Sequence, residues 1–220
     1  MHAQRSKPAT AQAARSSNPG RPKDLAKRAA ILEAAKQLFT QNGYAGVSMD
    51  QIAQAAGVSK LTVYSHFGDK DGLFAEVVRA HCEQAMPAHL FEPDPDLPLR
   101  ERLTLVARAF LQMVMTPEAI AGHRILCSPQ VAQSGISELF WDAGPARIDT
   151  AFTALLQRRI EAGQLEIPEP SRASCHFFTL LKGNIHAQAV LGHGFDSSTE
   201  ELNAHLNSVV DLFLRAYAVR

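Results

Sequence analysis

The sequence predicts an all-α fold in two parts: an N-terminal three-helix helix-turn-helix domain and a C-terminal helical domain. Three observations support this fold class. Apolar side chains recur at helical spacing through residues 28–78, turn-forming residues stand at each joint of that segment, and residues 81–220 show no strand-like alternation of useful length. We place the helix-turn-helix domain at residues 24–70, the second domain at 71–220 and a basic, disordered arm at 1–23.

The first two helices are defined by their apolar spacing and by the residues at their ends. In the first, Ile31, Ala35 and Phe39 follow one another at four-residue intervals, which places them on one helical face. Asn42-Gly43 ends this helix, because glycine tolerates the left-handed conformation of a helix C-cap. Ser48 then begins the second helix, and Gln51 three residues later completes a capping-box pattern.

The third helix, at residues 60–67, follows a tight turn at Gly57-Val58. Ser59 is suited to cap its N-terminus, and Val63 and Phe67 can anchor it to the other two helices. A cation, hydroxyls, rings and an exposed leucine are left for the outer face, which suits phosphates, base edges and a thymine methyl group. A helix-turn-helix commonly places such a helix in the DNA major groove.

The segment IAQAAGVSKLTVYSHFGDKDGLF resembles the DNA-binding signature of the TetR/AcrR family of bacterial transcriptional regulators. The resemblance is free of gaps over about fifty residues and implies DNA contacts at Ser48, Ser59, Lys60, Leu61, Thr62, Tyr64, His66 and Lys70. It implies that Ser48 and Lys70 contact phosphates and that residues 59–62 form the leading edge of the recognition helix. It also implies that the rings of Tyr64 and His66 contact the DNA backbone.

The charge distribution is uneven although the net charge is zero. Residues 1–30 contain seven Lys and Arg residues and one Asp, a net charge of +6, so the remainder of the chain sums to −6. A basic segment beside a helix-turn-helix is typical of a DNA reader. The Gly20-Arg21-Pro22 core is similar to the AT-hook motif, so we also expect Arg21 to bind an A·T-rich minor groove, with a solvated tail as the alternative.

The second domain reads as helices separated by proline and glycine. We expect helices at 99–115, from 117 to before 129, through 134–163 with a break at Gly144-Pro145, from 171 to about 192, and from about 198 to 220. The last helix is apolar on two sides, so we expect one side to face a second subunit, with a monomer that buries both sides internally as the alternative. The stripe assigned to that interface contains Leu206, Val209, Val210, Phe213 and Tyr217. In the resembling family, the last two long helices form a four-helix bundle across a dimer.

The segments TPEAIAGHRILCS, ELFWDAGPARI and LKGNIHAQAVLG are similar to the AefR-like branch of that family. Aromatic and soft apolar residues gather here with a few polar groups, a composition typical of small-molecule sites. The predicted lining of an effector pocket is Phe110, Met113, Val114, His123, Arg124, Phe140, Trp141, Phe177, Leu181 and Asn184. For any one aromatic residue, the plain hydrophobic core is the alternative.

Other classes of function find little support in the sequence. No nucleophile elbow, phosphate loop or dinucleotide fingerprint occurs, so we expect neither an enzyme nor a cofactor. The three cysteines are isolated and no histidine pair has ligand spacing, so we expect buried thiols and no metal site. No signal peptide or apolar span is evident, which favours a cytoplasmic protein that does not enter a membrane.

These observations predict a homodimeric transcriptional regulator, a repressor that leaves a palindromic double-stranded DNA operator when a small apolar or amphipathic effector binds. The alternative is an architectural DNA-binding protein that responds to no effector. An enzyme with a helical body is a third hypothesis, and no nucleophile paired with a base supports it.

Overall fold

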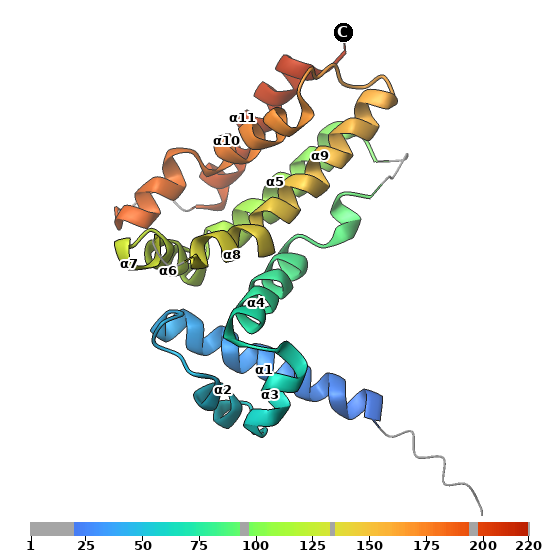
Figure 1. Cartoon of the computed structure of the whole chain (residues 1–220). Helices are drawn as coiled ribbons and strands as arrows, with labels where there is room; N and C mark the ends of the chain where they lie inside the picture. The colour runs from blue at the N-terminus through green and yellow to red at the C-terminus, as the bar shows by residue number, and fades with distance from the viewer. Residues whose placement is uncertain (1–19, 93–96, 133–134, 194–197, 220) are drawn as a thin grey trace, which may run out of the picture.

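The structure is a computed structural model that describes residues 20–92, 97–132, 135–193 and 198–219. Three helices, α1 (Gly20–Asn42), α2 (Met49–Ala55) and α3 (Lys60–Phe67), form one end of the molecule, as Figure 1 shows. Their buried side chains make a small core of their own, in which Ile31, Ile52 and Val63 are fully buried. Packing in this core fixes the orientation of α3 relative to α1 and α2.

Helix α1 begins earlier than the sequence predicted. We expected residues 1–23 to form a disordered arm, yet Gly20–Lys23 belong to α1. Pro22 is compatible with a first helical turn, where the missing N–H has no partner to lose. Residues 1–19 lie outside the described residues, so the rest of the predicted arm stays a prediction.

Helix α4 (Lys70–Ala85) belongs to both domains, so the predicted boundary at residue 70 is misplaced. Leu73 and Val77 pack in the core of α1–α3, whereas Cys82 and Ala85 pack against the core of the second domain. Figure 1 shows α4 standing between the two parts of the molecule. Because α4 packs in both cores, a movement of the second domain would displace α4 and, with it, the helix-turn-helix domain.

The contact of α4 with the second domain is close at Gly144. A Cβ atom added there would lie 2.8 Å from Cys82 Sγ and 3.0 Å from Val78 Cγ1, so only glycine permits this approach. Burial raises the pKa of the Cys82 thiol to about 11. Cys127 and Cys175 are exposed, which corrects the expectation that the thiols are buried.

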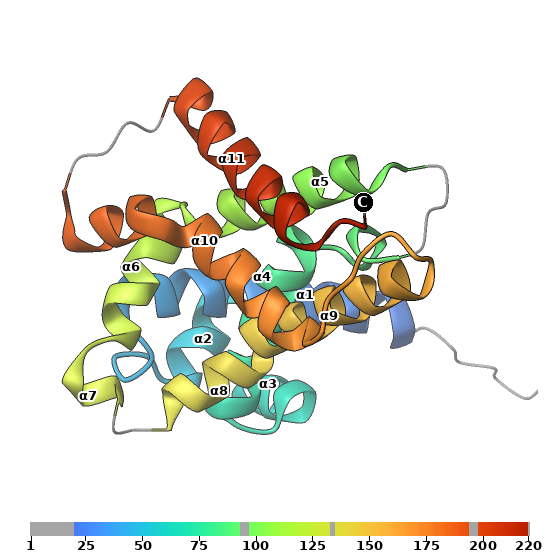
Figure 2. The same cartoon turned by 90° about the horizontal axis from the view of Figure 1, so that it is seen from above.

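The second domain contains the remaining helices. After a 3₁₀ turn at Ala88–Leu90, they are α5 (Leu99–Val114), α6 (Pro117–Leu126), α7 (Pro129–Ala132), α8 (Ile136–Ala143), α9 (Pro145–Glu161), α10 (Pro170–Leu191) and α11 (Thr199–Tyr217). The sequence predicted no helix at α7, and the bounds of the other helices agree with the predicted ones to within a few residues. Viewed from above in Figure 2, α10 crosses the middle of the domain and α11 lies at its edge. In the described part of the chain, the nearest approach to a strand is an isolated bridge between Leu165 and Ala218.

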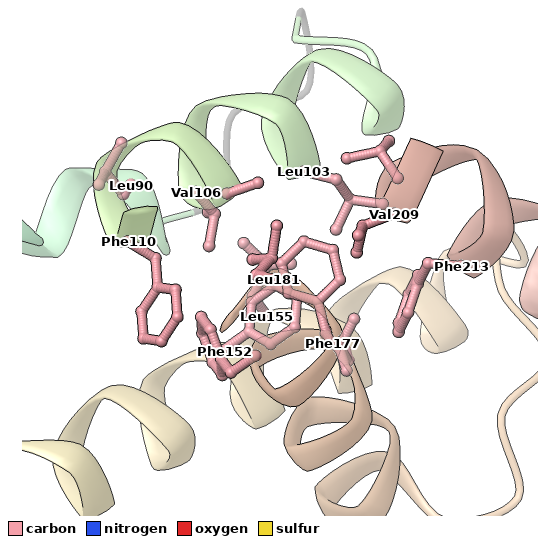
Figure 3. Close-up of a cluster of buried hydrophobic side chains, with 14 of the residues drawn as sticks. Leu90, Leu103, Val106, Phe110, Phe152, Leu155, Phe177, Leu181, Val209 and Phe213 are labelled. Carbon is pink, nitrogen blue, oxygen red and sulfur yellow. The ribbon is translucent and has the colours of Figure 1, made fainter. Parts of the chain in front are cut away.

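A cluster of phenylalanine side chains forms the centre of this domain (Figure 3). Phe152 of α9 stacks on Phe177 of α10 at 4.8 Å between ring centres, and Phe177 meets Phe213 of α11 edge-on at 5.1 Å. Leu103 of α5 is fully buried against the same cluster. Aromatic pairs at such distances add to the burial energy of their rings, so α5, α9, α10 and α11 are held as one unit.

The face of α11 that we assigned to a dimer interface is the face that builds this core. Leu206, Val209, Val210 and Phe213 are at most 6% exposed, and Tyr217 packs against Phe213 at 4.9 Å. Four of the five residues assigned to the interface are therefore covered within the subunit. Both sides of the helix are apolar, and spacing alone does not show which side the chain itself covers. The other side carries Leu212, which is 51% exposed.

Helix α10 is kinked where the sequence predicted a continuous helix. Gly183 has φ 45° and ψ −152°, a conformation outside the helical region that glycine adopts readily. Near the kink, the Leu181 carbonyl oxygen lies 2.9 Å from His205 Nε2 of α11. After the kink, the second half of α10 lies against α6, where Arg124 donates a hydrogen bond to the Val190 carbonyl oxygen.

No helix of the described residues is by itself both long and apolar enough to cross a membrane. Helices α5 and α6 meet that length and composition only as a pair, with a 69° bend between them. The apolar side chains of α5, among them Leu103 and Val106, are buried in the core described above.

Candidate nucleic-acid interface

Two serine caps position the helices of the predicted interface. Ser48 Oγ accepts a hydrogen bond from the Gln51 backbone N–H, and the Gln51 side chain accepts one from the Ser48 backbone N–H at 2.8 Å. This reciprocal pair is the predicted capping box. Ser59 caps α3 by accepting from the Thr62 backbone N–H, and its Oγ lies 2.8 Å from Thr62 Oγ1. Both caps fix the start of a helix at the surface.

The outer face of α3 is open to solvent. Leu61 is 79% exposed and Tyr64 is 41% exposed, and Lys60 is exposed as well, whereas Val63 and Phe67 are buried beneath them. Burial of Val63 and Phe67 anchors the helix. The exposed side chains therefore face outward. Leu61 lies in the first turn of α3 beside the exposed Lys60, so this end of the helix is accessible to another molecule.

Lys60 is held by a carboxylate of the preceding helix. Its ammonium nitrogen lies 3.0 Å from Asp50 Oδ2, and both side chains remain more than half exposed. The hydrogen bond to Asp50 and its charge raise the pKa of Lys60. An exposed ion pair of this kind exchanges readily for another anion, because each partner keeps most of its hydration.

Lys70, at the start of α4, is anchored instead by neutral groups. Its ammonium donates a hydrogen bond to the Val47 carbonyl oxygen at 2.8 Å and lies 4.1 Å from the centre of the Tyr44 ring. Val47 directly precedes Ser48, so two residues for which we predicted phosphate contacts are brought together from separate helices. The arrangement accounts for a lysine at the positive end of a helix dipole, where a cation is otherwise unfavourable.

His66 lies differently from the expected backbone grip. Its side chain is 14% exposed, and Nε2 is 3.0 Å from Asp24 Oδ1 of α1. A contact of His66 with a DNA phosphate therefore requires this pair to open. The side chain of Arg21, the remaining predicted DNA contact, lies outside the described residues, although its backbone is part of α1.

Three residues of this region were missed by the sequence analysis: Tyr44, Asp24 and Asp50. Tyr44 holds Lys70 through its ring and bonds to Asp71 through its hydroxyl, and burial followed by that hydrogen bond raises the pKa of the phenol. Its signal was an aromatic residue directly after the Asn42-Gly43 turn. The two aspartates gave no signal, because their partners are ten and 42 residues away in the sequence.

The residues predicted to line an effector pocket lie in several environments. Phe110, Phe177 and Leu181 are buried in the aromatic core, and Met113 and Val114 pack against it. Phe140 is half-buried on α8. Trp141, at 57% exposed, and Asn184 face solvent, so neither lines an enclosed cavity here.

The two polar residues of α6 in that set lie against α10. The His123 ring meets the His186 ring edge-on at 5.0 Å. Arg124 donates hydrogen bonds to the carbonyl oxygens of Val190 and Ala189 at 2.6 and 2.7 Å. Hollows of about 360 and 520 Å³ lie on the outer face of α11 and at the start of α10, away from the predicted lining.

Two family models match the sequence. Residues 31–77, which hold the helix-turn-helix, match the model of the bacterial regulatory proteins of the tetR family. Residues 101–219, more than half of the chain, match the C-terminal domain of AefR-like transcriptional repressors. The chain belongs to the TetR family. The resemblance of both halves is thereby confirmed, including the AefR-like branch for the second domain.

Curated TetR-family relatives align over most of the chain. The repressor AcnR of Corynebacterium glutamicum is 26% identical over 185 residues, which cover 83% of this chain and 89% of the relative. The repressor BdcR of Escherichia coli is 27% identical over 186 residues, with 81% and 86% covered.

Solved TetR-family structures share the whole fold. A regulator from Mesorhizobium loti superposes with a TM-score of 0.72 at 28% identity, covering 90% of this chain and 99% of that one. The flavonoid-responsive regulator FrrA superposes with a TM-score of 0.69 at 32% identity, with 88% and 98% covered. The all-α, two-domain prediction is confirmed. The TetR family and these relatives are transcriptional regulators rather than enzymes, and this protein is a DNA-binding transcriptional regulator.

Proposed function

We propose that this TetR-family protein is a repressor that binds a palindromic operator as a homodimer in the cytoplasm. A small apolar or amphipathic effector in the second domain releases it. TetR-family regulators bind operator DNA and act as dimers with small-molecule effectors, which supports the general scheme. The observation that carries the proposal is the outer face of α3, where Lys60, Leu61 and Tyr64 are exposed on a helix anchored from behind.

The contacts around α3 divide into two kinds. Ser48, Tyr64 and Lys70 carry hydroxyl or ammonium groups suited to phosphates, which position a protein on DNA without reading its sequence. Leu61 and Thr62, in the first turn of α3, are placed where a recognition helix reaches base edges. We propose this division for the interface, with Ser59 capping α3 and Lys60 exchanging Asp50 for a phosphate.

The proposed dimer uses the outward face of α11 beside α10. Small residues recur there at four-residue intervals, at Ala204, Ser208 and Ala216, with Leu212 between them. Small side chains allow two helices to approach closely, and an exposed leucine gains from being covered. Leu180 of α10 is a second exposed leucine, at 39%, and we include it in the proposed interface.

The proposed effector acts through the shared helix α4. An effector shifts DNA affinity only by its difference in affinity for the two states of the protein. The close contact of α4 with Gly144 joins the second domain to the helix that carries Lys70. A ligand that favours another position of α8 and α9 therefore changes the placement of α3. The relative FrrA is named as flavonoid-responsive, which supports a small organic effector for this chain.

The test is selection of binding sites from random duplex DNA with the full-length protein. We expect an inverted repeat, and we expect light scattering of the bound complex to give an even number of subunits per site. The same protein incubated with an effector library should lose affinity for that site. Binding without a consensus, unaffected by any compound, would instead favour the alternative of an effector-independent architectural protein.

A further inference from the structure

Two histidine rings and a lysine lie near one another where α6 packs on α10, around the kink at Gly183. His123 on α6 and His186 on α10 are in edge-to-face ring contact at 5.0 Å. Lys182 directly precedes the kink at Gly183, and its charge acts on both rings. His186 is 7% exposed, and His123 and Lys182 are half-buried, so the cluster is only partly open to solvent.

The cluster has no counter-ion among the described residues. Lys182 makes no hydrogen bond or ion pair to any of them. Burial lowers the pKa of Lys182, and burial and then the charge of Lys182 lower the pKa of His123. Burying an ammonium group without a partner is costly unless an anion compensates it.

The surroundings hold the cluster in place. The α10 kink at Gly183 lies directly after Lys182, and a Cβ atom at Gly183 would approach His205 Cε1 at 3.3 Å. On α6, Arg124 ties the helix to the Val190 carbonyl oxygen at the far end of α10. The three basic groups therefore lie on two helices, α6 and α10, that are held in place by these contacts.

We propose that Lys182, His123 and His186 form the subsite that binds the carboxylate of an acidic, amphipathic effector. The ammonium group and the N–H groups of neutral imidazoles donate hydrogen bonds, and a carboxylate accepts them at both oxygens. Leu181, the chain neighbour of Lys182, is buried in the aromatic core, so the apolar part of such an effector would lie next to that core. The inference deepens the proposed function and rests on it, since it names the chemical class of the effector.

The position of His123 also gives the subsite a route to the DNA-binding domain. Ile125, two residues further along α6, packs against the turn at Gly43, where a Cβ atom would lie 3.8 Å from Ile125 Cγ2. That turn ends α1 and precedes the capped start of α2. A carboxylate that draws His123 and Lys182 together changes the position of α6, and the turn at Gly43 moves with it.

The test is NMR of the full-length protein with isotope-labelled histidine, titrated with benzoate and, separately, with benzamide at equal ionic strength. The two probes have nearly the same shape and differ in charge. We expect benzoate to shift the imidazole signals of His123 and His186 saturably and benzamide to leave them in place. Lys182→Met should weaken benzoate binding at least about tenfold, since a charge-assisted contact is lost, and Lys182→Arg should retain it.

The matched control is Lys27→Met, which removes an exposed lysine of α1 and should leave benzoate binding unchanged. Equal responses to benzoate and benzamide, no saturable shift with benzoate, or an unchanged benzoate affinity in Lys182→Met would each overturn the subsite. If Lys182→Met does not fold, Lys182→Gln replaces it. Operator binding measured on the same sample reports the proposed function separately: a protein that binds operator and ignores benzoate loses only the subsite.

Discussion

Lys70 and Val47 are joined by a hydrogen bond of 2.8 Å from the lysine ammonium to the backbone carbonyl oxygen. The bond connects the first residue of α4 to the residue before the cap of α2. One N–H group of the Lys70 ammonium is engaged in this bond, and the centre of the Tyr44 ring lies 4.1 Å from the ammonium nitrogen. Lys70 is thus held in one orientation before any DNA binds, which lowers the entropy lost when a phosphate is contacted.

Lys70→Ala should weaken binding to all DNA sequences by a similar factor, because a phosphate contact is blind to bases. The slope of log affinity against log salt should fall by about one for each subunit bound. Fluorescence anisotropy over a salt series, with operator and with unrelated DNA, measures both quantities. A changed base preference with an unchanged salt slope would contradict the assignment.

Lys36→Ala is the matched control for this substitution. Lys36 is on α1, and its charge acts on His81 of α4, on the side of the DNA-binding domain that faces the second domain. The same loss of one positive charge there should leave the salt slope unchanged. Equal reductions in both variants would show a non-specific effect of net charge.

Leu61→Arg should change the preferred operator rather than the stability of the protein. Leu61 is 79% exposed, so no packing inside the subunit is lost. A side chain in the first turn of a recognition helix reaches base edges, and each base contact is worth about 1–3 kcal/mol of discrimination. Selection from random DNA should return a new consensus. Leu191→Arg, which adds the same charge at a 75% exposed position of α10, should return the original one. An unchanged consensus for Leu61→Arg would place base reading elsewhere.

The helix-turn-helix could be predicted almost completely from the sequence because its signals are local. The Ser48 and Ser59 caps and the burial of Val63 and Phe67 depend on residues within one or two turns. The pairing of His66 with Asp24 could not be predicted, since it joins the first turns of α1 to the end of α3.

The second domain was harder to predict because its helices are apolar on more than one side. Spacing placed Phe213 on a stripe of α11 but did not show that Phe177 and Phe152 cover that stripe from within the subunit. The kink at Gly183 also escaped prediction, since a glycine inside a helical pattern is usually tolerated without a break. Which side of a helix is covered depends on contacts between residues far apart in the sequence.

His186 should make the protein less stable in acid. Burial, then His123 and Lys182, lower the pKa of His186 from 6.5 to about 4 in the folded state. As the pH falls between these two values, the unfolded chain takes up a proton that the folded protein does not, so unfolding becomes more favourable. His186→Asn should flatten the fall in melting temperature over this pH range, as measured by circular dichroism. His193→Asn, at an exposed position, should keep the original profile. Identical profiles for all three proteins would show that His186 is not buried as a neutral ring.

Leu212 and Phe213 are adjacent on α11 and should respond in opposite ways to a charge. Phe213 is 2% exposed and packs on Phe177, so Phe213→Asp should destabilise the subunit itself, by about 3–5 kcal/mol. Leu212 is 51% exposed and belongs to the proposed dimer face, so Leu212→Arg should leave the fold intact and shift the protein toward monomer. The monomer should bind an inverted repeat weakly, because one helix-turn-helix reads half of the site. Light scattering, thermal melting and operator binding on both variants separate the two effects. A Leu212→Arg protein that remains dimeric with full operator affinity would exclude this face of α11 from the interface.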